Sequence, residues 1–438
     1  MLYSYLSRAI LIFADVVSIL FSIILAVAFR QLLGMCFPSL PVIDFSYINF
    51  ASVYVTLVII FAYFGLYTKR YDFWYETKLI VKASFFSFLL LFAGLALGQN
   101  AEFYSRSTLF LIFFFVTFIT PLSKLLMKSI LFKVGFWRCK AKVISDNTEF
   151  KYEIFNDSYL GYVKSNDSQH SVLFIDSYDM SREKLDKIIE NNIRNCREII
   201  FSPILDGYDF SNSIIYNLFE SRKNIFTLEN ELLKKKNRLL KFFMDYAIVL
   251  ISSVFWLPIF LAIMLKIKLE DPKGNIFFVQ KRLGLNGREF KCYKFRSMLS
   301  DQSFMEKWLD EHPEERENYR VYHKYINDPR ITKIGAFLRK TSLDELPQLL
   351  NVLKGEMSLV GPRPYMVEEK ADIGKKSSMV LAVKPGITGL WQVSGRSDVD
   401  FSKRVKIDVW YMKNWSLWND IVILIKTISI VLYRRGAY

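Results

Sequence analysis

The chain has 438 residues, of which 52% are hydrophobic, and its formal net charge is +15. This length exceeds one ordinary domain and the apolar content excludes a wholly soluble protein, so we expect a membrane protein with soluble parts. The excess of Lys and Arg could attract nucleic acid, anionic lipid or a phosphorylated substrate. Because the basic residues lie beside apolar segments rather than along a polar helix with base-stacking aromatics, we expect no nucleic acid partner.

Four apolar segments come first, and each has roughly the twenty residues that a membrane-spanning helix needs. They cover residues 9–33, 49–67, 79–98 and 108–132. The first is too long for a cleaved signal peptide and is followed by further spans. We therefore predict a transmembrane four-helix bundle over residues 1–138. Asp15 lies inside the first segment, and we expect it to pair with another group in the bundle.

The basic residues near these segments predict their orientation. One set of ends and loops holds most of them: Arg8, Lys69, Arg70, Lys78, Lys124, Lys128, Lys133, Arg138 and Lys140. The opposite loops hold little beyond Arg30 and Arg106. Since loops rich in Lys and Arg stay in the cytoplasm, the N-terminus and everything after the fourth span should be cytoplasmic. We expect no paired ionisable groups and no broken repeats within the spans, which argues against a transporter.

Residues 139–232 alternate short apolar runs with a helical stretch, which is typical of a small open α/β domain. The apolar runs are AKVIS, SVLFID, EIIFSP and NIFTL, and the helical stretch is SREKLDKIIENNIRN. The first run continues into SDNTEF rather than into a glycine-rich turn. Without such glycines the backbone cannot approach a pyrophosphate closely, so we predict no dinucleotide binding.

A fifth apolar segment runs from Phe242 to about Leu265. Lysines and arginines flank both of its ends, so both flanks should remain in the cytoplasm. Pro258 removes a backbone hydrogen bond inside the segment and bends the helix. We therefore predict a helix that enters and leaves the membrane on the same side.

The other segments of this half of the chain predict local structure. In residues 276–298, apolar and polar side chains alternate on both sides of Asn286-Gly287, and this pattern predicts a tight hairpin. Residues 299–327 are highly charged and predict a mobile helix or lid, with a solvated surface as the alternative. Residues 413–434 predict an amphipathic helix in the membrane interface rather than a sixth span.

Two adjacent carboxylates stand in the stretch TSLDELPQLLNVLKGEMSLVGPRP. Ser342 and Glu345 fit a capping box at a helix start, where Asp344 and Glu345 would merely complement the helix dipole. Arg339 precedes this pair and Arg363 follows it, however, and a helix N-terminus flanked by guanidinium groups is a phosphate site. Such a field should also keep Asp344 ionised, as a carboxylate nucleophile must be.

Further residues extend this candidate phosphate site. Pro364 directly follows Arg363 and belongs to the same candidate phosphate site. Arg296 and Arg396 are further candidates for donating hydrogen bonds to phosphate. The alternative for Arg296 is that it is an exposed arginine on a strand. A carboxylate that attacks phosphorus also needs a divalent cation to neutralise the phosphoryl oxygens. Asp344 and Glu345 could supply oxygen ligands for this ion, expected to be Mg²⁺.

Five strings connect the chain to a known family: KFRSM, DPRITKIG, LRKTSLDELPQLLNVLKGEMSLVGPRP, KPGITGLWQVSGRS and the terminal RRGAY. From about residue 235 to 438 the chain closely resembles the bacterial sugar transferase family of polyprenyl-phosphate hexose-1-phosphate transferases. The resemblance implies an α+β catalytic domain over 233–438 with a re-entrant membrane helix. It also implies a Rossmann-like module at 139–232, a homodimer as a possible assembly, and a role for Glu345 in orienting the metal or assisting proton transfer.

The resulting hypothesis is transfer of a hexose 1-phosphate, galactose or glucose, from a UDP-sugar to undecaprenyl phosphate, with UMP as the other product. The resemblance implies that this reaction begins O-antigen, capsule or exopolysaccharide synthesis at the bacterial inner membrane. Asp344 would hold the phosphosugar between two half-reactions. Magnesium, Arg339, Arg363 and Arg396 would stabilise the developing charge. The alternative is a non-catalytic membrane scaffold that binds anionic lipid and tolerates the loss of Asp344.

Overall fold

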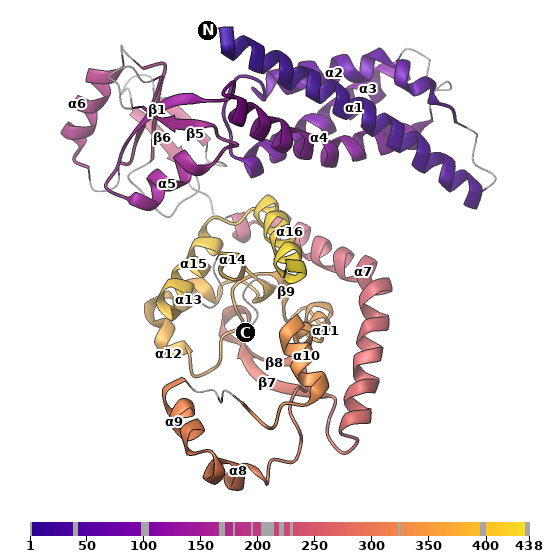
Figure 1. The fold of residues 1–438 in the computed structure, drawn as a ribbon, viewed down its shortest axis with the longest axis vertical. Coiled ribbons are helices and arrows are strands. Elements are labelled where there is room, and N and C mark those ends of the chain that lie inside the picture. The colour runs from indigo at the N-terminus through magenta and orange to yellow at the C-terminus, as the bar shows by residue number, and fades with distance from the viewer. Residues whose placement is uncertain are drawn as a thin grey trace. The chain divides into compact units, whose positions relative to one another are not determined.

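The structure of the protein is a computed structural model, drawn as a ribbon in Figure 1. It describes residues 2–37, 43–97, 105–165, 171–177, 180–193, 196–202, 214–218, 223–227, 231–322, 325, 327–394 and 400–433. The chain divides into two compact units, Met1–Asp206 and Gly207–Tyr438. Each unit has hydrophobic cores of its own.

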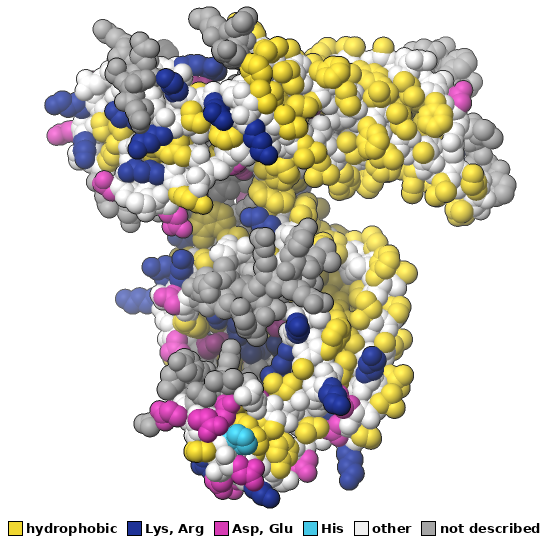
Figure 2. Space-filling view, in the orientation of Figure 1, with side chains coloured by type: hydrophobic (Ala, Val, Ile, Leu, Met, Phe, Trp, Pro, Cys, Tyr) yellow, Lys and Arg dark blue, Asp and Glu magenta, His cyan; other side chains and the backbone are white. Residues whose placement is uncertain are grey.

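The first unit begins with apolar helices that pack side by side (Figure 1). They are α1 (Leu2–Cys36), η1 (Phe45–Asn49), α2 (Ala51–Tyr63), α3 (Phe73–Leu97) and α4 (Arg106–Val134). Helix α4 packs against α1 and α3, and α3 packs against α2. By length and hydropathy α1, α3 and α4 can each cross a membrane. Hydrophobic side chains cover much of the visible surface of these helices (Figure 2), so the chain has the character of a membrane protein.

The second predicted span, residues 49–67, is shorter than expected. Its helix α2 has 13 residues, because η1 occupies the preceding turns and Gly65, with φ 76°, turns the chain soon after α2 ends. At 1.5 Å per residue α2 is about 20 Å long, whereas the hydrocarbon core of a bilayer is about 30 Å thick. The prediction of four full-length spans is therefore wrong at α2.

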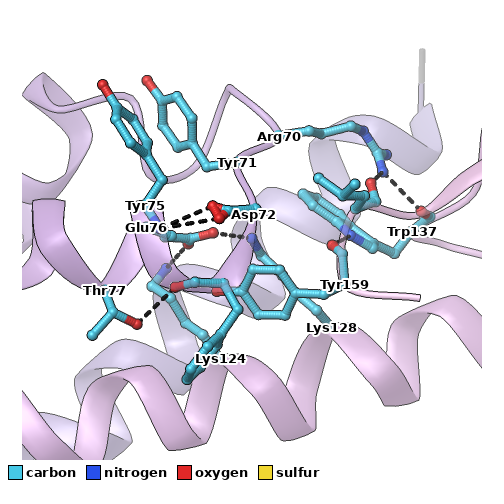
Figure 3. A network of polar contacts seen from close by, with 12 residues as sticks. Arg70, Tyr71, Asp72, Tyr75, Glu76, Thr77, Lys124, Lys128, Trp137 and Tyr159 are labelled. Atoms are coloured by element: carbon cyan, nitrogen blue, oxygen red, sulfur yellow. Dashed lines mark hydrogen bonds and ion pairs between the residues drawn. The ribbon is translucent and has the colours of Figure 1, made fainter. Parts of the chain in front are cut away.

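Four ionisable side chains are buried together among the helices of this bundle, and Figure 3 labels Glu76, Lys124 and Lys128 among them. Lys124 on α4 pairs with Asp15 on α1 at 3.0 Å and with Glu76 on α3 at 3.7 Å. Lys128, one turn further along α4, pairs with Glu76 as well. Two acids and two bases compensate one another, which limits the free-energy cost of burying charge in an apolar bundle.

These ion pairs bear on three sequence-based expectations. The expected pairing of Asp15 within the bundle is confirmed. The expectation that the spans lack paired ionisable groups is wrong, because charges on α1, α3 and α4 meet only when the helices pack. Lys124 and Lys128 are fully buried, so they cannot be counted among the basic loop residues that predict orientation.

A four-stranded parallel sheet follows α4 in the same unit, with the order β2-β1-β3-β4. Its elements are β1 (Cys139–Ile144), α5 (Thr148–Asn156), β2 (Tyr162–Lys164), β3 (Val172–Ile175), α6 (Arg182–Asn192) and β4 (Glu198–Phe201). The turn after β1 is closed by a side chain, because Asn147 accepts hydrogen bonds from the first backbone N–H groups of α5. Three of the predicted apolar runs, AKVIS, SVLFID and EIIFSP, form β1, β3 and β4 of this sheet. The fourth run, NIFTL, lies in β6 (Lys223–Thr227), which pairs antiparallel with β5 (Ile214–Leu218) in a separate sheet.

The bundle and the sheet are joined through Arg70, in the loop before α3. Its guanidinium donates hydrogen bonds to the carbonyl oxygens of Trp137, at 3.0 Å, and Leu160, at 2.7 Å. The same guanidinium lies 4.0 Å from the centre of the Trp137 ring. Gly161 has φ 73°, and a Cβ there would lie 2.3 Å from the Trp137 carbonyl oxygen, so this junction admits only glycine.

The second unit contains α7 (Lys235–Glu270), a continuous helix that includes Pro258 and changes direction along its length (Figure 1). Both of its ends contact the folded part of this unit. Near the start, Lys241 donates to the carbonyl oxygen of Val360 at 2.9 Å. At the end, the Glu270 carboxylate accepts from the N–H groups of residues 333 and 334. Between these ends the helix exposes an apolar surface, with Val254 74% exposed.

The hairpin predicted around Asn286-Gly287 is confirmed. Strands β7 (Phe277–Leu283) and β8 (Glu289–Phe295) pair antiparallel across a turn, η5 (Leu285–Gly287), in which both Asn286 and Gly287 have positive φ. The charged stretch that follows forms two helices, α8 (Met305–Glu311) and α9 (Pro313–Tyr322).

The rest of this unit consists of short elements. They are β5 (Ile214–Leu218), β6 (Lys223–Thr227), η4 (Glu231–Leu233), α10 (Lys333–Thr341), η6 (Leu343–Glu345), α11 (Gln348–Leu353), β9 (Ser358–Val360), α12 (Lys370–Ile373), η7 (Gly374–Lys376), α13 (Ser377–Val380), β10 (Gly386–Thr388), α14 (Leu390–Val393), α15 (Phe401–Lys413) and α16 (Leu417–Tyr433). Strands β9 and β10 pair in parallel. The predicted last helix, residues 413–434, is α16, which begins four residues later.

Helix α16 is fixed to the core by a buried carboxylate. Asp420 has no exposed surface and accepts hydrogen bonds from Lys241 at 2.6 Å, Tyr411 at 2.7 Å and Trp415 at 2.9 Å. These contacts link α7, α15 and α16. Asp420 and Trp415 are therefore parts of the interior rather than of a polar helix surface.

Candidate active site

The chain presents Asp344 and Glu345 on a short 3-10 turn, η6. Helix α10 ends at Thr341, and Ser342 adopts the left-handed conformation with φ 56°. The Ser342 side chain makes no capping hydrogen bond, and α11 begins only at Gln348. The predicted capping box is therefore wrong, because Ser342 closes the preceding helix instead of opening the next one.

The two carboxylates line a cavity of about 540 Å³. Arg339, Arg363 and Arg404 lie in its wall together with the ring of Trp391. A smaller cavity of about 110 Å³ adjoins it and shares Glu345, Arg363 and Trp391. The smaller cavity adds further side chains: Arg282, Lys294, Gln348 and Pro364. Asp344, Glu345, Arg339, Arg363 and Pro364, all selected from the sequence, thus meet in one region.

Lys294 was not selected from the sequence, although it is the nearest cation to the acidic pair. Its Nζ lies 2.6 Å from Glu345 Oε1 and 3.9 Å from Asp344 Oδ2. Strand β8 carries it to η6 from 50 residues earlier in the chain. Its place within the KFRSM string is the one sequence signal that could have found it.

Burial raises the pKa of Asp344, and the nearby Glu345 carboxylate raises it further. The positive charges of Lys294 and Arg339 act in the opposite direction but do not reverse it. The sequence indicated only the lowering effect of the flanking cations on this pKa, because desolvation is not visible in a sequence. A cation or a hydrogen-bond donor brought by a substrate would favour the ionised carboxylate.

Two arginines share one aromatic ring in the wall of the larger cavity. The guanidinium carbon of Arg404 lies 4.4 Å from the centre of the Trp391 ring, and that of Arg363 lies 5.7 Å from it. Burial, together with the charge of Arg363, lowers the pKa of Arg404. Two like charges held this close attract an anion strongly, and the forked guanidinium group suits phosphate oxygens. Arg404 was missed because no motif marks it in the sequence.

A buried carboxylate holds the segment that carries Arg363. Asp408 on α15 accepts from the Tyr365 hydroxyl at 2.7 Å and from the Arg363 backbone N–H at 3.4 Å. Burial raises the pKa of Asp408 to about 7. The Asp408 side chain therefore positions the segment that carries Arg363 without lining the cavity itself.

Two candidate arginines lie elsewhere or cannot be placed. Arg296 pairs with Asp271 at 2.6 Å and lines neither cavity around Asp344. Hydrogen bonds from Ser300, together with the charge of Arg296, hold the pKa of Asp271 well below its usual range. In this conformation Arg296 fixes the loop that follows α7. Arg396 lies outside the described residues.

The oxygen ligands at η6 suit a metal ion whose coordination is completed by the substrate. Within the described ranges no group of three or more His, Cys, Asp or Glu residues comes together. Magnesium is usually held by one or two carboxylates plus substrate phosphates and water, rather than by a cage made wholly of protein. The adjacent carboxylates of Asp344 and Glu345 fit that mode of binding.

An acidic pair and several guanidinium groups share one cavity, in a chain that has helices long and apolar enough to cross a membrane. Such a set of side chains suits the binding of phosphorylated substrates. The family model described as bacterial sugar transferase matches residues 236–434. An "Uncharacterized sugar transferase" of Haemophilus influenzae is 35% identical over 409 residues, covering 85% of each chain. The chain therefore belongs to the bacterial sugar transferase family, as its motifs indicated.

Two relatives carry more specific names. The "Undecaprenyl-phosphate galactose phosphotransferase" of Salmonella typhimurium is 34% identical over 407 residues, covering 85% of this chain and 84% of its own. The "UDP-glucose:undecaprenyl-phosphate glucose-1-phosphate transferase" of Xanthomonas campestris is 40% identical over 202 residues, covering 44% of this chain and 39% of its own.

Proposed function

We propose that this enzyme transfers hexose 1-phosphate from a UDP-sugar to undecaprenyl phosphate and so begins the synthesis of a bacterial polysaccharide such as O-antigen, capsule or exopolysaccharide. The names of the relatives support this substrate pair, with galactose or glucose as the sugar. The observation that carries the proposal is the placement of Asp344 and Glu345 in one cavity with Arg339, Arg363 and Arg404.

The transfer proceeds in two displacements. An Asp344 oxygen bonds to the sugar-side phosphorus, the bond to the bridging oxygen breaks, and UMP leaves with that oxygen and its electron pair. An oxygen of undecaprenyl phosphate then bonds to the same phosphorus, and the bond to Asp344 breaks and regenerates the carboxylate. Two anionic substrates thereby react without meeting directly.

The surrounding side chains bind the phosphate groups and stabilise the charge that develops on them. Arg363 and Arg404, held against Trp391, bind phosphate oxygens and stabilise the charge of the transition state. Lys294 pairs with Glu345 and lowers the proton affinity of Asp344. Asp344 and Glu345 would hold a magnesium ion together with the substrate diphosphate, and the ion would supply further neutralisation of the phosphoryl oxygens.

The proposed location of the site rests on α7. Both ends of this bent helix contact the catalytic unit, while its middle exposes apolar side chains such as Val254. We place this middle part in the inner membrane as a re-entrant helix with both ends cytoplasmic, together with the N-terminus and the catalytic unit. A lipid phosphate in that membrane and a soluble nucleotide sugar can then reach the same cavity.

The test is release of UMP by the purified full-length chain with undecaprenyl phosphate and a panel of UDP-sugars. Asp344→Ala should reduce UMP release to background, whereas the exposed control Asp372→Ala should leave it unchanged. The panel also identifies the sugar. Undiminished release from Asp344→Ala would refute the assigned nucleophile, and no release with any UDP-sugar would favour a non-catalytic scaffold.

A further inference from the structure

A second large cavity lies in the catalytic unit, away from the acidic pair. Its volume is about 500 Å³, and none of its lining residues lines either cavity around Asp344. The first turns of α7 form one wall, with Leu239 and Phe242, and Val383 and Met412 lie among the other lining residues. An apolar cavity beside a membrane helix suits the hydrocarbon part of an amphiphile.

More positive than negative side chains line this cavity. Lys235, Arg238 and Lys384 belong to its lining, and none of them forms an ion pair with a carboxylate in the part of the chain that the structure describes. Lys241, in the same lining, is instead occupied by Asp420 and a backbone carbonyl oxygen. Lys384 Nζ also lies 5.9 Å from the centre of the Phe242 ring. Three cations without an ion-pair partner among the described residues, beside an apolar cavity, complement an anionic headgroup.

One buried acceptor in the lining also lacks a partner. Asp245 is 4% exposed, and its Oδ2 accepts from the Ser358 hydroxyl at 2.6 Å. Its Oδ1 accepts no hydrogen bond from any described residue. A buried acceptor without a donor is costly, so a ligand that brings a hydroxyl group to this oxygen gains affinity.

We infer that this cavity binds an anionic phospholipid, phosphatidylglycerol, that is not a substrate of the enzyme. An acyl chain lies along the apolar wall, the phosphate contacts Lys235, Arg238 and Lys384, and the glycerol headgroup donates a hydroxyl hydrogen bond to Asp245. This lipid fixes the entry of α7 at the membrane surface. The inference does not depend on the chemistry assigned to Asp344.

The test measures how many phospholipids the full-length protein retains, by native mass spectrometry, after titration of delipidated protein with phosphatidylglycerol in micelles. The double variant Lys235→Gln/Arg238→Gln should bind the lipid about 30-fold more weakly, because each basic residue near an anionic lipid contributes about 1 kcal/mol. The matched control Lys236→Gln/Lys266→Gln removes two charges from the same helix outside the cavity lining, and it should bind as the wild type does. Equal weakening in both variants would overturn the site.

A second variant tests the apolar part without removing charge. Ala382→Trp adds a large ring at the cavity lining and should reduce retention of phosphatidylglycerol while UMP release persists. Asp344→Ala, in contrast, should retain the lipid although transfer is lost. Equal retention of phosphatidylcholine would refute selection by charge. Competition by inorganic phosphate would indicate a free-anion site, and preferential retention of undecaprenyl phosphate would make the cavity an acceptor site; either result would overturn the proposal.

Discussion

Asp408, which accepts a hydrogen bond from the backbone N–H of Arg363, makes the stability of the catalytic unit dependent on pH. Its pKa in the folded state is about 7, against an ordinary value of 3.8. The folded chain therefore holds a proton on Asp408 between these values that the unfolded chain has released, and stability falls as the pH rises through this range. At 1.36 kcal/mol for each tenfold change in proton affinity, the loss above pH 7 is at most about 4 kcal/mol.

Asp408→Asn keeps the shape and the carbonyl acceptor for the Tyr365 hydroxyl but cannot ionise. It should match the wild type near pH 4 and be more stable at pH 8. For a domain of this size, a change of 1 kcal/mol moves the melting temperature by about 2–4 °C, so the gain at pH 8 is at most about 8–16 °C.

The assay is thermal unfolding of the full-length protein in one detergent, followed by intrinsic fluorescence at several pH values between 4 and 8. The exposed Asp372→Asn serves as the control, and its curves should follow those of the wild type. If Asp408→Asn and the wild type lose stability equally between pH 4 and 8, the buried proton on Asp408 does not exist.

Three further changes test other parts of the structure. Lys294→Met removes a charge that lowers the pKa of Asp344, so the acid limb of UMP release against pH should move to higher pH; an unmoved limb would separate the lysine from the reactive carboxylate. Asp15→Asn and Lys124→Met should each destabilise the bundle by about 3–5 kcal/mol, because each leaves the buried cluster of two acids and two bases with one uncompensated charge. The double variant should cost less than the sum of the singles in melting experiments, and strict additivity would contradict the pair. Gly161→Ala should lower the melting temperature of the first unit, because its Cβ would lie 2.3 Å from a backbone oxygen; an unchanged value would show that the junction can relax.

Features carried by neighbouring residues could be predicted from the sequence. Asn286-Gly287 determines a hairpin by its local conformational preference, and the hairpin is present. Asp344 and Glu345 were found because two adjacent acids between arginines have a chemical meaning that does not depend on the fold. The capping box failed for a local reason as well, since Ser342 ends one helix and cannot begin another.

Features that arise from distant residues could not be predicted. Lys294 and Arg404 reach the acidic pair from elements about 50 to 60 residues away, and no spacing rule connects them to it. The ion pairs of Glu76 with Lys124 and Lys128 depend on which faces of α3 and α4 meet. Hydropathy averages over these charges and therefore shows an apolar span where the packed bundle holds a compensated polar centre.

The most direct test of the proposed chemistry is mass spectrometry of the intact protein after incubation with its UDP-sugar and magnesium, without undecaprenyl phosphate. A covalent route through Asp344 predicts a mass increase of one hexose phosphate, located to the peptide that contains Asp344, and its loss when undecaprenyl phosphate is added. UMP release that occurs only with the acceptor present, from a protein that never gains this mass, would contradict the account and indicate direct displacement.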